Sequence, residues 1–97
     1  MMNKTIYFIN LFDYYGDLLT KKQQDYFKDY YFDNLSLSEI AENKQVSRNA
    51  AYKQIKDVEI KLKKYEDILK LYENGNEIKK IIKDLNPKIK KQIENLI

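Results

Sequence analysis

The chain has 97 residues and a net charge of +3, and it contains neither cysteine nor histidine. This length predicts one domain, residues 1–97. The missing residue types exclude disulfides, thiolate metal sites and the commonest general base, and two glycines are too few for a glycine-rich phosphate loop. The composition therefore predicts a protein that is not an enzyme and that holds no metal or cofactor.

The positive charge lies in the second half of the chain. Residues 1–48 carry six basic and seven acidic side chains, whereas residues 49–97 carry twelve basic and eight acidic ones. An uneven basic distribution of this kind favours a nucleic-acid partner. Lysine, asparagine, isoleucine and tyrosine are also abundant throughout, as in proteins from AT-rich coding sequences, and such a bias would produce the same excess.

The first predicted helix spans residues 3–15, with Asn3 or Thr5 as its cap. Its apolar residues recur at helical spacing (Phe8, Leu11, Phe12 and Tyr15), and Gly16 is expected to end it, because glycine is preferred after helix C-termini. The apolar run at residues 6–12 is too short to cross a membrane and is not followed by a small-residue cleavage site. We therefore expect a cytoplasmic protein without a membrane contact.

A second helix is predicted after an apolar connection, Leu18 and Leu19, that should be buried. Thr20 and Gln23 have the spacing of a capping box, and the helix should run to about Asp33. Aromatic residues recur along it at helical spacing: Tyr26, Phe27, Tyr30 and Tyr31. Such a stripe could stack on the bases of a single-stranded nucleic acid. Aromatic residues at this spacing usually form a core, however, and that is the interpretation we prefer.

Residues 34–56 predict two short helices joined by a tight turn. Ser36 and Glu39 form a second capping-box spacing, so the first helix should run from about Leu37 to Asn43. Ser47 is a good cap for the helix that follows. Because so few residues separate the two helices, they must cross steeply, and this is the geometry of a helix-turn-helix.

Small and apolar residues should seal this crossing. Ala41 is small enough for the closest approach, Val46 should be buried under the turn, and the inner face of the second helix should consist of Ala50, Ala51 and Ile55. Gln45 stands at the position where such turns usually carry glycine. A left-handed backbone at this glutamine would therefore be mildly unfavourable.

The outer face of the second helix is polar and basic. Ser47, Arg48, Asn49, Tyr52 and Lys53 would face DNA bases and nearby phosphates, and Lys21, Lys22 and Lys56 would contact the backbone. Arg48 is the only arginine of the chain, and its planar guanidinium can bind guanine or phosphate through two hydrogen bonds. The alternative is a solvated hairpin face, or one used for protein contacts, because folds of this kind host several functions.

The second helix of the pair is expected to continue to Gly75 as an extended recognition helix. Apolar residues follow a 3-4 spacing along it: Ile55, Val58, Leu62, Tyr65, Leu69 and Tyr72. This seam must pack on the first helix, on the C-terminal helices or on the same seam of a second copy. A homodimer is therefore expected.

Two short amphipathic helices complete the chain. One is predicted at Glu77–Leu85, and the next starts at Pro87 with Asn86 as its cap. Their opposite faces are basic: Lys79, Lys80, Lys83, Lys88, Lys90 and Lys91. A solvated lysine face explains this pattern, and phosphate groups or an acidic protein surface are the alternatives. The sequence thus predicts an all-α protein, with a helix-turn-helix core at 3–62 and an extension at 63–97 for dimerisation or partner binding.

Three segments of this sequence together resemble the YlxM family of small bacterial helix-turn-helix proteins, over residues 11 to about 59. They are LFDYYGDLLTKKQ (11–23), YFKDYYFDNLSLSEIAE (26–42) and VSRNAAYKQIK (46–56). The resemblance implies a fold similar to the promoter-reading fourth region of sigma factors, with the second helix of the pair offered to the DNA major groove. It carries over no catalytic residue.

The same resemblance implies a second hypothesis. Members of the family are generally encoded beside the GTPases of the signal recognition particle, and a role in that targeting pathway has been suggested from this arrangement. The protein would then be an accessory module that binds the particle RNA or the GTPases, and its helix-turn-helix would be a scaffold. DNA binding and this role are the two functions that the sequence supports.

Overall fold

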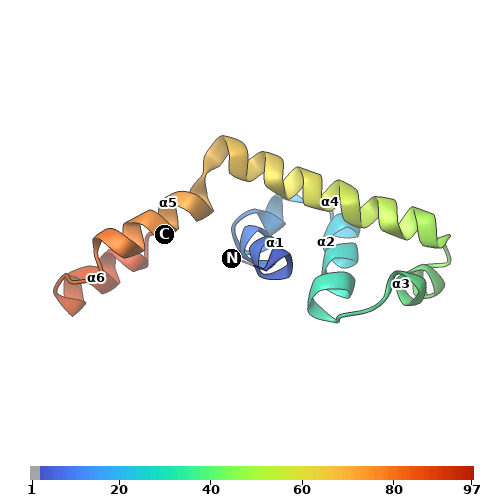
Figure 1. Ribbon diagram of the computed structural model, residues 1–97, viewed down its shortest axis with the longest axis horizontal. Coiled ribbons are helices and arrows are strands. Elements are labelled where there is room, and N and C mark those ends of the chain that lie inside the picture. Colours follow the sequence, from blue (N-terminus) through green and yellow to red (C-terminus); the bar gives the residue numbers. More distant parts are fainter. Residues whose placement is uncertain (1–2) are drawn as a thin grey trace.

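The computed structural model describes residues 3–97, and every element within that range is helical (Figure 1). This confirms the all-α fold class. The elements are α1 (Lys4–Tyr15), a 3-10 turn η1 (Gly16–Leu18), α2 (Lys21–Phe27), a π-helical turn η2 (Lys28–Phe32), α3 (Leu37–Lys44), α4 (Arg48–Leu69), α5 (Leu71–Ile81) and α6 (Pro87–Glu94).

The helix starts predicted from polar caps are confirmed. The Asn3 side chain accepts the Thr5 N–H, and Ser47 and Asn86 cap α4 and α6 in the same way. Both capping boxes are complete, Thr20 with Gln23 and Ser36 with Glu39. The backbone N–H of Ser36 donates to the Glu39 carboxylate, and this hydrogen bond lowers the pKa of Glu39.

The long helix α4 lies across α1, α2 and α3, and the core fills the space between them (Figure 1). Aromatic rings from α1, α2 and η2 dominate this core. The rings of Phe12 and Phe27 stack with centroids 4.3 Å apart, and those of Phe27 and Tyr31 with centroids 4.4 Å apart. Tyr26, Phe27 and Tyr31 are buried, so the aromatic stripe belongs to the core, as we expected.

Two details around the first helices differ from the sequence prediction. Leu19 is buried, but Leu18 is 54% exposed, because the 3-10 turn rotates the two neighbouring side chains to different sides. Gly16 follows α1 as predicted, yet its φ of −56° is one that any residue adopts. A Cβ atom at this position would lie 3.1 Å from the Phe12 ring, so close packing explains this glycine.

The long helix ends earlier than predicted. α4 stops at Leu69, Lys70 adopts a left-handed φ of 55°, and α5 starts at Leu71. Gly75 lies inside α5 rather than at a helix end, and the hydroxyl of Tyr14 lies 2.8 Å from where its Cβ would be. The prediction of one helix that continues to Gly75 was therefore wrong, and that of a helix over Glu77–Leu85 has wrong bounds.

The apolar seam predicted along this helix is only partly buried. Ile55, Val58 and Leu62 are buried within the same chain, against the core formed with α1, α2 and α3. Leu69 is 47% exposed at the end of α4. The first part of the seam is thus occupied in this chain, so it is not the surface on which a second copy could pack.

Candidate nucleic-acid interface

The turn between α3 and α4 has the geometry of a helix-turn-helix. Gln45 ends α3 in the left-handed conformation with φ 56°, and the N–H of Val46 donates to the Ala41 carbonyl at 3.0 Å. The Ser47 hydroxyl then accepts the Ala50 N–H at 3.0 Å and starts α4. The expectation that Gln45 would occupy a position usually taken by glycine is therefore confirmed.

The two helices are sealed by Ile40 and Ala41 of α3 against Ala51 and Ile55 of α4, all of which are buried. Val46 and Ala50 were assigned wrongly. Val46 is 37% exposed, and the side chain that reaches inward from the turn region is that of Lys44. Ala50 is exposed, because it lies about 100° around the helix from the fully buried Ala51.

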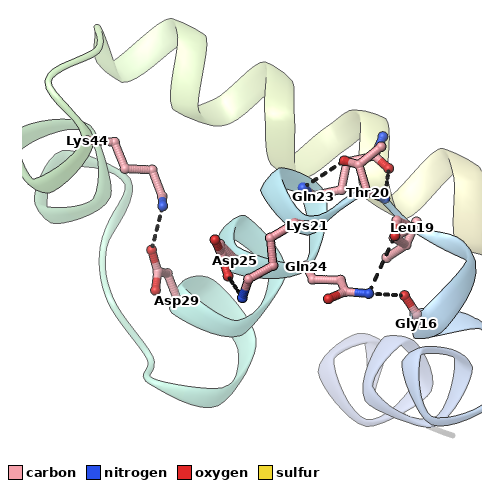
Figure 2. Close-up of polar contacts among 9 residues, drawn as sticks. All are labelled: Gly16, Leu19, Thr20, Lys21, Gln23, Gln24, Asp25, Asp29 and Lys44. Carbon is pink, nitrogen blue, oxygen red and sulfur yellow. Dashed lines mark hydrogen bonds and ion pairs between the residues drawn. The ribbon is translucent and has the colours of Figure 1, made fainter.

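Lys44 ties the end of α3 to the preceding π-helical turn. Its ammonium lies 3.4 Å from the Asp29 carboxylate and 4.8 Å from the centroid of the Tyr26 ring, and Figure 2 shows the ion pair with Asp29. Both charged side chains are about three-quarters buried, so the pair is screened less than a surface ion pair. The lysine thus links α3 to η2 and to the Tyr26 ring.

The predicted reading surface is present on the first two turns of α4. Ser47, Arg48, Asn49, Tyr52 and Lys53 are all exposed. Asn49, Tyr52 and Lys53 face away from the buried Ala51 and Ile55, whereas Ser47 and Arg48 are exposed because they form the start of the helix. Arg48 is the first residue of α4, and no ion pair involves its guanidinium within the part of the chain that the structure describes. We call this set the reading face.

The three lysines predicted to touch the backbone are arranged differently. Lys56 is half-buried, and its ammonium lies 3.6 Å from the Glu59 carboxylate. Lys21 and Lys22 lie at the start of α2, where Lys21 pairs with Asp25 at 2.9 Å and thereby lowers the pKa of that carboxyl (Figure 2). The structure therefore brings neither of these two lysines to the reading face itself.

The contact of Lys61 with α2 shows which part of α4 lies next to Lys21 and Lys22. The Lys61 ammonium donates to the side chain of Gln23, which is the third residue of α2. Lys61 follows Arg48 by thirteen residues, or roughly 20 Å of helix. Lys61 thus lies beside the first turn of α2, the helix that carries Lys21 and Lys22. Sequence reasoning missed Lys61, because only the tertiary contact between α2 and α4 brings it to the other two.

Two buried carboxylates on α4, Glu59 and Glu66, were not predicted from the sequence. Glu59 accepts a hydrogen bond from the Tyr31 hydroxyl, and Glu66 accepts one from the Tyr15 hydroxyl at 2.6 Å. Burial and the Glu59 hydrogen bond raise the pKa of Tyr31. The available signal was the spacing of Ile55, Glu59, Leu62 and Glu66, which places both carboxylates on the apolar side of the helix.

Residues 3–97 contain no cluster of three or more acidic side chains arranged to hold a metal ion. Within the same range no helix has the length and apolar character to cross a membrane.

The left-handed turn at Gln45 and the sealed contact between α3 and α4 define a helix-turn-helix protein. The chain belongs to the UPF0122 family, whose model is described as "Putative helix-turn-helix protein, YlxM / p13 like" and matches residues 2–97. The expected family is thereby confirmed, and the match also includes the C-terminal third, where the sequence showed no motif.

Relatives from several bacilli agree with this assignment. The UPF0122 protein of Bacillus thuringiensis (strain Al Hakam) is 44% identical over 92 residues, which cover 95% of this chain and 84% of the relative. That of Halalkalibacterium halodurans is 42% identical with the same coverage. The protein BcerKBAB4_3669 of Bacillus mycoides (strain KBAB4) is 46% identical over 85 residues, or 88% of this chain and 77% of the relative.

Proposed function

We propose that this protein is a non-enzymatic regulator that binds duplex DNA through the reading face. One observation carries the proposal: the exposed side of α4 at the turn consists of polar and basic residues, while its other side is buried against α3. Arg48 and Asn49 are suited to the base edges of guanine and adenine, and Ser47, Tyr52 and Lys53 to nearby phosphates or bases. The N-terminus of α4 also favours a phosphate.

Lys21, Lys22 and Lys61 support a second contact with the DNA backbone. They lie roughly 20 Å along α4 from Arg48, too far for the same base pairs but within reach of phosphates further along the duplex. Lys56 would add a contact only by giving up part of its pairing with Glu59. Such contacts fix register and orientation rather than sequence.

The test is a binding titration of duplex DNA at several salt concentrations. Each neutralised phosphate contributes a slope of roughly −0.9 in log K against log salt. Arg48→Ala should weaken specific binding by about 1–3 kcal/mol, because it removes a two-pronged base contact. Lys83→Ala, which removes a lysine near the other end of the molecule, is the matched control and should leave the affinity unchanged. Equal affinity of the Arg48→Ala variant and the wild type would refute the role of the reading face.

The second candidate is an accessory module of the signal recognition particle, which the family resemblance implies. The observation in its favour is the exposure of lysines on α5, on α6 and in the loop between them, where Lys79, Lys80, Lys83, Lys88 and Lys91 all face solvent. Reversing two of these charges (Lys83→Glu with Lys88→Glu) should then abolish binding to the particle RNA or its GTPases. The same variant should bind DNA like the wild type if the reading face is the DNA site.

Two further parts of the proposal follow from these partners. Bacterial DNA and the signal recognition particle both occur in the cytoplasm, so we propose that the protein acts there. We also propose a homodimer, since paired helix-turn-helix units commonly bind paired half-sites. Because the first part of the α4 seam, Ile55, Val58 and Leu62, is buried within the chain, the proposed dimer uses another surface.

A further inference from the structure

Helices α5 and α6 form an arm that projects from the body of the molecule, at the end opposite the turn between α3 and α4 (Figure 1). We use the term arm for residues 71–97. The chain doubles back within the arm, because Leu96 and Ile97 line one hollow of about 280 Å³ together with Leu71 and Ile78 of α5 and Tyr14 of α1. The arm is therefore a helical hairpin that contacts the body mainly at its base.

The arm leaves most of its large apolar side chains in solvent. Ile82 is the one aliphatic side chain of the arm that is buried in the described structure. The exposed ones are Leu71 (46%), Ile81 (76%), Leu85 (43%), Ile89 (49%) and Leu96 (84%). We call these five residues the arm patch. They come from α5, from the loop after it, from α6 and from the segment that follows α6, and Leu71 and Leu96 line one hollow together.

Helices as short as α5 and α6 need additional apolar packing to be stable. α5 has 11 residues and α6 has 8, and helices shorter than about 12–15 residues are marginal in water unless an apolar face is packed. The hairpin supplies one layer of such packing through Ile82 and the half-buried Ile78 and Ile93. A second hairpin placed over the arm patch would complete a four-helix bundle, which is the usual way for two such layers to pack.

The available area agrees with a dimer of this kind. A leucine or isoleucine side chain removes roughly 100 Å² of apolar surface from water when it becomes fully buried. Five side chains that are about half exposed or more would contribute on the order of 300 Å², before backbone and lysine stems are included. A standard interface buries about 800 Å² per partner, of which somewhat more than half is apolar. The arm patch is thus large enough for the core of such an interface.

Charge placement agrees as well. Lys79 and Lys80 lie on another side of α5 from its apolar residues, and Lys83 is exposed in the loop that follows. A partner on the patch would leave these three lysines in water. The rim also carries carboxylates, among them Asp84 and Glu94, which are exposed and could pair with lysines of a second copy. Because an interface between identical copies with twofold symmetry is self-complementary, a rim with both signs suits it.

We propose that the protein forms a twofold homodimer through the arm patch, with the arms of two copies packed as a four-helix bundle. This inference specifies the interface of the homodimer proposed above and does not require DNA binding. The partner is a second copy of this chain. The experiment must distinguish this partner from two others that could bind the arm patch, an anionic membrane and an acidic protein.

Sedimentation velocity of the full chain at 5–100 μM, without DNA, tests the proposal. The wild type should sediment as a dimer, and Ile81→Glu and Ile89→Glu should each weaken association at least tenfold. Ile68→Glu is the matched control, because Ile68 is 67% exposed on α4, outside the arm. It should leave the dimer intact. Far-UV circular dichroism verifies that each variant keeps the helical content of the wild type.

Cross-linking tests the proposed packing directly, since the chain contains no cysteine of its own. Leu85→Cys should give a covalent dimer with a short bismaleimide, whereas Ile68→Cys should not. A wild type that remains monomeric at 100 μM would overturn the proposal, as would association that is lost in Ile68→Glu but kept in Ile89→Glu. Binding of a monomeric wild type to vesicles with 30% anionic lipid would assign the patch to a membrane surface instead.

Discussion

Glu66 caps a helix other than its own. α5 begins at a left-handed Lys70 and has no side-chain cap from that residue. The Glu66 carboxylate accepts the N–H groups of Tyr72 at 3.1 Å and Glu73 at 3.0 Å, and the Tyr15 hydroxyl accepts the N–H of Leu71 at 3.0 Å. These are donors that the first turn of a helix leaves without a partner. A buried carboxylate on α4 and a tyrosine on α1 therefore fix the direction in which the arm leaves the body.

Glu66→Gln should destabilise the protein without changing the size of the side chain. An amide has one acceptor oxygen where the carboxylate has two, so one of the N–H groups at the start of α5 would lose its partner. Hydrogen bonds to charged groups contribute about 1.5–3 kcal/mol, and we expect a loss of unfolding free energy in that range. Urea denaturation measures it. Asp67→Asn, at the exposed neighbour, should change stability by less than about 0.5 kcal/mol.

The same pair predicts how stability responds to alkaline pH. Burial, and then the hydrogen bond to Glu66, raise the pKa of Tyr15 from 10.0 to about 12. The folded state therefore keeps the hydroxyl proton at pH values where the unfolded chain releases it. The stability from this group is fully present below pH 10 and is lost as the pH rises from about 10 to 12.

Thermal unfolding measured from pH 9 to pH 11.5 tests this sign. The melting temperature of Tyr15→Phe should be lower than that of the wild type at pH 9, but it should fall less steeply as the pH rises. Tyr31 also has a raised pKa, so some slope remains in the variant. Parallel curves for the two proteins would exclude Tyr15 as a source of the alkaline loss.

At the scale of elements, the turn between α3 and α4 combines a good cap with an unfavourable backbone. Gln45 has a φ of 56°, which a residue with a Cβ atom adopts at an energetic disadvantage of roughly 1–2 kcal/mol. Gln45→Gly removes this strain but increases the freedom of the unfolded chain. We therefore expect a net gain of about 0.5–1 kcal/mol in unfolding free energy by urea denaturation.

The control for this substitution is Asn43→Gly, in α3 two residues earlier. There the backbone is helical, and glycine forms helix slightly less well than asparagine, so Asn43→Gly should destabilise by roughly 0.3 kcal/mol. DNA affinity of the Gln45→Gly variant should stay at the wild-type value, since the reading face begins two residues later. A destabilised Gln45→Gly would mean that contacts of the glutamine side chain outweigh its backbone strain.

Local chemistry made the helix starts and the helix-turn-helix predictable from the sequence. A serine, threonine or asparagine cap satisfies backbone N–H groups within three residues, so Asn3, Thr20, Ser36, Ser47 and Asn86 each determined a start without knowledge of the fold. The break at Lys70 was not predictable in this way. It depends on Glu66 and Tyr15, and Tyr15 is 51 residues away from its carboxylate partner.

The candidate site was predictable to the same extent. The helical period places Asn49, Tyr52 and Lys53 away from the buried Ala51 and Ile55, and the structure agrees. Arg48 is on the same stripe as Ala51 and Ile55, and it is exposed because it is the first residue of α4. The helical period gives no information on how α2 packs against α4. The distance of Lys21 from the reading face and the contact of Lys61 with α2 could therefore not be predicted from it. Val46 was misassigned because a left-handed turn rotates the following side chain outward, and sequence patterns do not specify that rotation.

At the scale of the whole molecule, the two surfaces of interest lie far apart. The principal-axis extents are 53 × 26 × 24 Å, and α4 runs along much of the longest one from the turn region towards the arm (Figure 1). The reading face is at one end and the arm patch at the other. Two copies joined through their arms would thus carry their reading faces outward, separated by more than the length of one molecule.

This separation predicts the spacing of DNA sites. Half-sites on one face of the duplex are separated by whole helical turns of about 34 Å, or 10–10.5 base pairs. Two chains of 53 Å that overlap over an arm should span two or three turns, roughly 70–100 Å, rather than one. Selection of binding sequences from random 60-base-pair duplexes should therefore enrich inverted repeats with centres about 21 or 31 base pairs apart.

A variant that cannot dimerise through the arm tests the predicted spacing independently of DNA binding. Ile89→Glu should select single half-sites with the same base preferences as the wild type, because its reading face is unchanged, and it should lose the preference for spacing. Arg48→Ala should keep any spacing preference but lose base specificity at the position that the arginine reads. Enrichment of repeats one turn apart would contradict an arm-to-arm dimer, since reading faces at opposite ends of such an assembly cannot approach within 34 Å of each other.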